Sequence, residues 1–165
     1  MSATRLLSHT NASNKAIMRS VFRSHHEGDD IVDKEGLRSV LKEISSRVQE
    51  EINTSDKSIK SLMLLMDSDN NGTVDFEEFF KWWSKLIKND VKKVGGVVDE
   101  ISTLYENYIS YDKDGKGYLN HDQFKMLWED MGNDPCFAAE AINYVDANHD
   151  NQISFQELCI AFNII

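Results

Sequence analysis

The sequence predicts an all-α protein built from four helix–loop–helix units in two pairs, with short β contacts between the paired loops. Apolar residues recur at helical spacing in eight segments along the chain. A short acidic connection lies inside each successive pair of segments, and the four connections resemble one another. The chain has one proline, Pro135, and no low-complexity tract. Because the four connections are spread along the chain, the repeated helix–loop–helix unit accounts for nearly the whole sequence.

In the first half of the chain, the apolar spacing predicts four helices. Thr54 or Ser55 is a suitable N-cap for the third of them, because a hydroxyl oxygen can accept a hydrogen bond from a backbone N–H of the first turn. The helices are expected over residues 13–23, 37–48, 59–66 and 76–87.

The second half repeats this arrangement. Asp134 followed by Pro135 is typical of an N-cap and a first helical position. Gly95 and Gly96 disfavour a helix that continues from the first half, so a non-helical linker is expected there. The predicted domains are residues 1–92 and 93–165, and the helices of the second half are expected over residues 97–108, 124–131, 134–145 and 155–162.

The chain is acidic, with a formal net charge of −10 and a pI of about 4.9. This charge argues against nucleic acid as a partner and against docking on anionic lipid. It fits either a cation-binding protein or a solvated acidic surface. The N-terminus lacks the apolar run of a secretory signal, and no stretch is long enough for a membrane span. The cytoplasm is the expected location, and the chain is expected to be a monomer.

Residues 67–78 place oxygen-bearing side chains at regular positions of an acidic connection. A calcium ion takes about six to eight oxygens, and a loop of about twelve residues supplies them from positions 1, 3, 5, 7, 9 and 12. Gly72 at position 6 allows the sharp turn, and Val74 at position 8 is apolar, as expected for a residue that pairs with a neighbouring loop. The expected ligands are Asp67, Asp69, Asn71, Thr73 through its carbonyl, Asp75 and Glu78.

This pattern resembles the calcium loop of the EF-hand family, and residues 146–157 repeat it. Asn151 replaces glycine at position 6, and asparagine is among the few residues that tolerate the left-handed region. His149 is expected to point outward as a surface residue. The expected ligands are Asp146, Asn148, Asp150, Gln152 through its carbonyl, Ser154 and Glu157.

Residues 112–123 keep the frame of the loop but lose part of its chemistry. Lys116 places an ammonium group at position 5, and Gln123 replaces the bidentate glutamate with one neutral carbonyl. Both changes remove negative charge that a hard cation requires, so weak or absent calcium binding is expected. The residues at the ligand positions are Asp112, Asp114, Lys116, Tyr118, Asn120 and Gln123.

Residues 25–36 form the most decayed of the four loops. Val32 at position 8 sets the register, which places His25 at position 1 and Gly36 at position 12. Neither residue carries a carboxylate, so calcium binding is not expected. His25 and His26 suggest zinc, but two adjacent histidines without a third ligand are weak evidence.

The EF-hand resemblance implies that the loops lie side by side in pairs, the first with the second and the third with the fourth. Val32 would then face Val74, and Leu119 would face Ile153. Each pair would hold one competent loop and one impaired loop that acts as a brace. Two strong Ca²⁺ sites are therefore expected, at which Mg²⁺ can compete.

The whole pattern is similar to sarcoplasmic-type and calmodulin-like members of the family, which implies a calcium buffer or signal modulator. The alternative is a sensor that exposes an apolar groove and binds a helix of a target protein. Met63, Met66, Met126 and Met131 lie at core spacing, which favours the buffer. A third class, a photoprotein-like oxygenase, lacks a nucleophile–base pair in the sequence, so no enzyme is expected.

Overall fold

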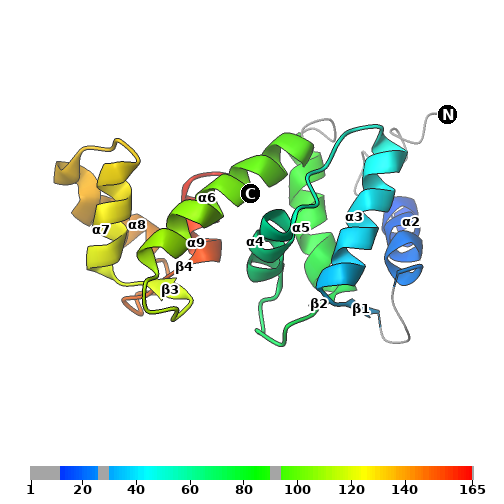
Figure 1. Ribbon diagram of the computed structural model, residues 1–165, viewed down its shortest axis with the longest axis horizontal. Coiled ribbons are helices and arrows are strands. Elements are labelled where there is room, and N and C mark those ends of the chain that lie inside the picture. The colour runs from blue at the N-terminus through cyan, green and yellow to red at the C-terminus, as the bar shows by residue number, and fades with distance from the viewer. Residues whose placement is uncertain (1–11, 26–29, 90–93, 165) are drawn as a thin grey trace. The chain divides into compact units, whose positions relative to one another are not determined.

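The computed structural model describes residues 12–25, 30–89 and 94–164 (Figure 1). Of the histidine pair that suggested zinc, His26 lies outside the described residues, and a ring nitrogen of His25 lies 2.7 Å from a carboxylate oxygen of Glu43. The chain divides into two compact units between Ser102 and Thr103. This division falls inside a helix, whereas the sequence-based boundary between residues 92 and 93 precedes that helix.

The first unit contains two helix–loop–helix units whose loops meet in a short antiparallel β contact. Val32 pairs with Val74, and Ile31 pairs with Asp75. This register confirms the predicted pairing of the first two loops. The elements are α2 (Ala12–Arg23), β1 (Ile31–Val32), α3 (Lys34–Val48), α4 (Asp56–Met66), β2 (Val74–Asp75) and α5 (Phe76–Asn89), followed by the start of α6 (Val94–Tyr111).

Side-chain caps fix the residues at which α3 and α4 begin. Asp33 accepts a hydrogen bond from the backbone N–H of Gly36 at 2.8 Å, and Ser55 accepts one from that of Ser58 at 3.3 Å. The second bond identifies Ser55, and not Thr54, as the N-cap of α4. Each cap satisfies an N–H group that has no partner inside its helix.

Aromatic side chains fill the core of the first unit. The ring of Phe22 on α2 packs edge-on against Phe76, with centroids 5.6 Å apart, and lies 5.5 Å from Phe79. Phe79 in turn stacks on Trp83 at 6.3 Å. Burial of side chains this large is the main source of stability for a unit of this size.

The exposed side of α2 is tied to the start of α5 by charge. The ammonium of Lys15 and the guanidinium of Arg19 each lie 2.7 Å from a carboxylate oxygen of Glu77. Arg19 also covers the ring of Phe76, with its guanidinium carbon 4.5 Å from the ring centroid. Exposed ion pairs contribute only up to about 1 kcal/mol each, so these contacts supplement the aromatic core.

The glycine pair does not form the non-helical linker that the sequence suggested. Helix α6 begins at Val94, so Gly95 and Gly96 lie in its first turn. The N–H of Gly95, which has no intrahelical partner there, donates to a carboxylate oxygen of Glu50 at 2.8 Å. A Cβ on Gly95 would lie 2.3 Å from the carbonyl oxygen of Glu51. The absent side chain thus serves close packing and not a break in the helix.

The second unit repeats the arrangement. Leu119 pairs with Ile153, which confirms the predicted contact between the third and fourth loops. Asp134 caps a short 3₁₀ turn at Pro135 and not the α-helix itself, so the helix expected over residues 134–145 is divided. After the end of α6, the elements are β3 (Tyr118–Leu119), α7 (His121–Asp130), η2 (Pro135–Phe137), α8 (Ala138–Val145), β4 (Ile153–Ser154) and α9 (Phe155–Ala161).

Tyr108 lies at the centre of the second unit. Its ring packs on Phe155 with centroids 5.3 Å apart, and its hydroxyl donates to the carbonyl of Gly117 at 2.8 Å. Burial, with the nearby carboxylates of Asp112 and Glu157 adding to it, raises the pKa of Tyr108. The tyrosine therefore stays neutral, and its hydroxyl holds the third loop through the bond to Gly117.

Two methionines expected in the core lie at the surface. The side chains of Met126 and Met131 are 58% and 38% exposed. Met66 is buried as expected. Helical spacing alone placed Met126 and Met131 inward, but α7 packs through Phe124 and Leu127 instead.

In the part of the chain that the structure describes, no helix is both long and apolar enough to cross a membrane.

Candidate metal-binding loops

The loop 67–78 gathers three carboxylates around one point. Oxygen atoms of Asp67, Asp69 and Glu78 lie within 4.8 Å of one another. Two oxygens on opposite sides of a calcium ion are about 5 Å apart, because each lies roughly 2.3–2.6 Å from the ion. The donor set therefore fits a hard divalent cation. Without one, the like charges repel at short range.

Hydrogen bonds tie the first and last predicted ligands to the loop between them. Asp67 accepts from the N–H of Gly72 at 2.8 Å. Glu78, in the first turn of α5, accepts from the N–H of Ser68 at 2.9 Å and from that of Asp75 at 3.1 Å. The glutamate thus reaches back across the loop to the residue that follows Asp67, which is the closure that a bidentate ligand at position 12 provides.

The loop 146–157 shows the same local bonding with fewer charges. Asp150 donates its N–H to the side-chain oxygen of Asn148 at 3.0 Å, and Glu157 accepts from the N–H of Ser154 at 2.9 Å. Ser154 and Glu157 form a capping box at the start of α9. These bonds join Asn148 with Asp150 and Ser154 with Glu157, and Asp146 is almost fully buried at 3% exposure.

Asp146 has a neighbour that the sequence did not indicate. A ring nitrogen of His121, which follows the paired strand β3, lies 3.1 Å from a carboxylate oxygen of Asp146. Burial opposes the ionisation of Asp146, but hydrogen bonds from His121 and from the N–H groups of Asn151 and Asp150 outweigh it, so the pKa lies below its usual value. The carboxylate is therefore held in its charged form.

Both strong loops use two left-handed residues, and the sequence pointed to only one of them. At position 6, Gly72 has φ 82° and Asn151 has φ 62°, which agrees with the expectation that asparagine takes the glycine conformation. At position 4, Asn70 has φ 56° and His149 has φ 59°. The second turn arises from the loop path and has no glycine to signal it. His149 is exposed, as predicted.

Replacing Asn151 by valine should destabilise the second unit by about 1–2 kcal/mol, because a β-branched residue is strained at positive φ. Thermal unfolding of the full chain in calcium and in chelator measures this loss. Gln152→Val is the matched control, since Gln152 is exposed and only its backbone carbonyl is a predicted ligand. Equal losses for both variants would contradict the assigned role of Asn151.

The loop 112–123 contains a cation of its own. The ammonium of Lys116 lies 2.5 Å from a carboxylate oxygen of Asp114, which is the predicted ligand at position 3. This ion pair lowers the pKa of Asp114 and raises that of Lys116. Gln123 accepts from the N–H of Asn120 at 2.8 Å and completes a capping box. The loop keeps its shape with a side-chain charge where a metal would need oxygen.

The first loop is also closed by a side-chain cation. Both carboxylate oxygens of Asp30, at the turn, accept hydrogen bonds from the guanidinium of Arg23. A Cβ on Gly36, at position 12, would lie 2.9 Å from the Cβ of Val32. A glutamate therefore has no room there without a shift of β1.

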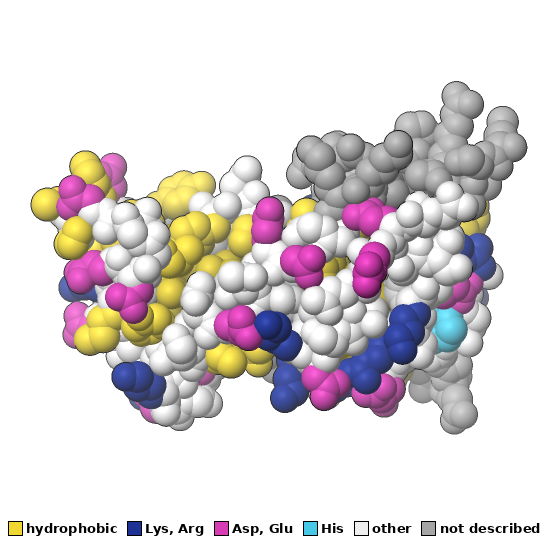
Figure 2. All heavy atoms as spheres, turned by 45° about the horizontal axis from the view of Figure 1, so that its top comes forward, with side chains coloured by type: hydrophobic (Ala, Val, Ile, Leu, Met, Phe, Trp, Pro, Cys, Tyr) yellow, Lys and Arg dark blue, Asp and Glu magenta, His cyan; other side chains and the backbone are white. Residues whose placement is uncertain are grey.

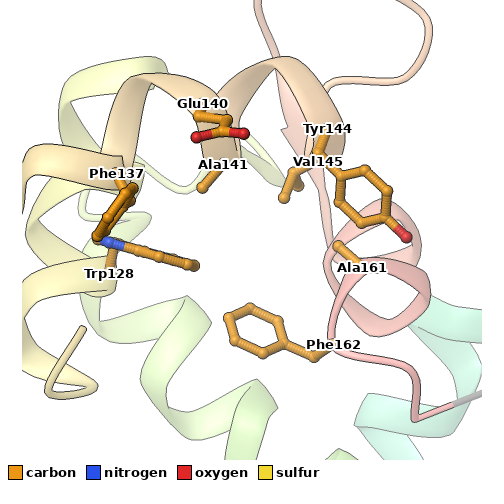
Figure 3. A pocket seen from close by; sticks show the side chains of 8 residues that line it. All are labelled: Trp128, Phe137, Glu140, Ala141, Tyr144, Val145, Ala161 and Phe162. Atoms are coloured by element: carbon orange, nitrogen blue, oxygen red, sulfur yellow. The ribbon is translucent and has the colours of Figure 1, made fainter. Parts of the chain in front are cut away.

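An apolar groove in the second unit was not foreseen from the sequence (Figure 3). Its volume is about 330 Å³, and four of its eight lining residues are aromatic. Phe137 and Tyr144 are 57% and 71% exposed. The lining residues are Trp128, Phe137, Glu140, Ala141, Tyr144, Val145, Ala161 and Phe162.

Paired helix–loop–helix units with acidic loops of this length define a class of metal-binding proteins. The chain belongs to the EF-hand domain pair family, whose model matches residues 16–84 and 101–163. The two matched regions each contain two of the four loops. Family membership supports calcium binding as the function of the chain.

The chain is also similar to a calmodulin-like protein and to calcium-dependent protein kinases. The chain is 22% identical to putative calmodulin-like protein 6 from Oryza sativa subsp. japonica over 91% of this chain and 84% of that protein. It is 29% identical to calcium-dependent protein kinase 21 from Arabidopsis thaliana over 76% of this chain, and 27% identical to calcium-dependent protein kinase 2 from Zea mays over 74%. These matches cover only 21% and 29% of the two kinases.

Proposed function

We propose that this protein is a calcium sensor with one strong calcium site in each unit, at residues 67–78 and 146–157, and with a target-binding groove in the second unit. The groove supports the sensor over the buffer that the sequence favoured. A buffer has no need of exposed aromatic side chains, and Phe137 and Tyr144 are both more than half exposed. The calmodulin-like relative points the same way.

Two of the predicted ligands, Asp146 and Glu157, lie on the same helices as residues that line the groove, or directly beside them. Asp146 directly follows Val145, the last residue of α8, and Val145 lines the groove. Glu157 lies one helical turn before Ala161, another lining residue on α9. Any displacement of Asp146 and Glu157 on calcium binding is therefore passed to both helices, which changes the width of the groove between them.

The chemistry of the groove favours a basic amphipathic helix as the target. Glu140 is the one charged residue in its lining, and Glu129, Asp130 and Asp134 lie nearby in sequence on or beside α7. Figure 2 shows hydrophobic and acidic side chains interspersed at the left of the view, where α7 and α8 lie. An apolar helix face would enter the groove, and lysine or arginine at its edge would meet these carboxylates.

The test is calcium-dependent binding of a synthetic Leu/Lys amphipathic peptide to the full chain. We expect calcium to promote binding, and Phe137→Glu to weaken it by about tenfold or more, as loss of a central aromatic contact does. Met126→Glu is the matched control, because Met126 is exposed to the same degree and does not line the groove.

Binding that is independent of calcium, or equally weakened by Phe137→Glu and Met126→Glu, would refute the sensor. Calcium uptake without peptide binding or any rise in hydrophobic-dye fluorescence would favour the buffer instead.

A further inference from the structure

The two units are repeats, so their residues can be matched by distance from the first residue of each loop. Matched in this way, the groove of the second unit has a counterpart face in the first unit, formed by α3, α4 and α5. In this matching Leu41 corresponds to Trp128 of the groove, Ser58 to Phe137, and Trp83 to Phe162. The complete counterpart face consists of Leu41, Ser58, Ser61, Leu62, Leu65, Met66, Trp82 and Trp83.

The counterpart face is closed. Each of its eight residues is at most 4% exposed, including the two indole rings of Trp82 and Trp83. In the groove itself, Tyr144 is 71% exposed, whereas its counterpart Leu65 is 4% exposed. The same framework therefore presents an open face in one unit and a covered face in the other.

The start of α6 supplies a cover for this face. Val94, Val98 and Ile101 follow one another at helical spacing and are at most 1% exposed, so this side of α6 is buried. On the same stretch, the hydroxyl of Ser102 donates to that of Ser58 at 2.9 Å, and both serines are buried. Ser58 belongs to the counterpart face, so the bond joins α6 directly to it.

Further contacts fix this segment in place along its first two turns. The N–H of Gly95 bonds to Glu50, and Asn53 donates its amide N–H to Asp99 of α6 at 3.0 Å. The backbone at Gly95 runs so close to Glu51 that a methyl group would overlap its carbonyl oxygen. Gly96, one residue later, has open space where its Cβ would be.

We propose that residues 94–102 of α6 are an internal occupant of the first unit's groove, held where the second unit would receive an external helix. The segment has the features of such an occupant: a helical stripe of apolar side chains, with a terminal serine that bonds to Ser58 of α4. The first unit therefore binds calcium without offering a groove, and recognition of other molecules rests with the second. The occupancy of the first groove does not depend on what the second unit binds.

Acrylamide quenching of Trp82 and Trp83 tests this assignment in the full chain, with Trp128→Phe as background so that only these two tryptophans emit. Gly95→Ala should raise the quenching constant several-fold and shift the emission to the red, because the new methyl group pushes α6 away from Glu51. Alanine favours a helix over glycine by about 1 kcal/mol, so helix propensity alone predicts the opposite. Gly96→Ala, the matched control, should leave quenching unchanged.

Val98→Asp, with Val97→Asp as its control on the half-buried side of α6, probes the same contact more strongly. In a Phe137→Glu chain, which lacks the second unit's apolar site, Val98→Asp should restore binding of a hydrophobic dye by opening the first groove. Far-UV circular dichroism checks that each variant is folded. If Val98→Asp does not fold, quenching in Gly95→Ala alone tests the assignment. Unchanged quenching in folded Gly95→Ala would overturn the assignment, whatever the result of the peptide experiment on the second unit.

Discussion

Replacing Glu78 by glutamine should abolish calcium binding in the first unit and leave the second unit's site intact. A glutamine amide offers one oxygen in place of two, and its NH₂ group meets the carboxylates of Asp67 and Asp69, which lie within 4.8 Å of Glu78. Calorimetric titration of the full chain should show about two strong sites in the parent and one fewer in the variant. Glu157→Gln should remove the other site.

Glu77→Gln is the control for this experiment. Glu77 neighbours Glu78 in the chain but pairs with Lys15 and Arg19 on α2, outside the loop. It should leave the stoichiometry unchanged. Calcium should stabilise the first unit of the parent by about 2.7 kcal/mol when free calcium is 100 times the dissociation constant. Glu78→Gln should lose this stabilisation, and Glu77→Gln should keep it. Unchanged stoichiometry in Glu78→Gln would show that the ligand assignment is wrong.

A third strong site should appear when Lys116→Asn and Gln123→Glu are combined. The first change removes the ammonium that lies 2.5 Å from the carboxylate of Asp114 and supplies an oxygen at position 5. The second restores the bidentate ligand at position 12, and glutamate also suits the capping box that Gln123 forms with Asn120. The same titration should then report one additional calcium ion per chain.

Lys113→Asn with Gln123→Glu separates local charge from ligand chemistry. Lys113 is exposed at position 2, outside the predicted shell, so this pair makes the same change in net charge without supplying the oxygen at position 5. It should raise affinity far less than the first pair. Equal gains from both pairs would mean that general electrostatics, and not Lys116, impairs the third loop.

Features that depend on local pattern were predictable from the sequence. The helices follow from apolar spacing, and the β register follows from the apolar residue at position 8, as the pairs Val32–Val74 and Leu119–Ile153 show. Asn151 adopts the predicted left-handed conformation because the turn geometry of the loop requires it. Calcium ligation at the two strong loops stays a prediction until ion uptake is measured.

Features that depend on contacts between distant segments were not predictable. Gly95 was expected to break a helix, but it lies in one because the backbone of Glu51 comes too close for any side chain. The contact of His121 with Asp146 joins residues of two different loops that are 25 positions apart in the chain. Met126 has the spacing of a core residue, yet its neighbours on α7 bury themselves and leave it outside. Sequence periodicity gives the direction of a side chain but not what covers it.

Two ion pairs bear on the steepness of the calcium response. One joins Lys116 to Asp114 in the third loop, and the other joins Arg23, the last residue of α2, to Asp30 at the turn of the first loop. In a pair whose two loops both take an ion, the first ion can order the loop that receives the second, and the binding curve steepens. Here Lys116 already pairs with Asp114, and Arg23 already pairs with Asp30, so neither partner loop is expected to take an ion. On the proposed assignment of one ion to each pair, the Hill coefficient of each unit should stay near 1, and calcium uptake should be graded over a wide range of concentrations.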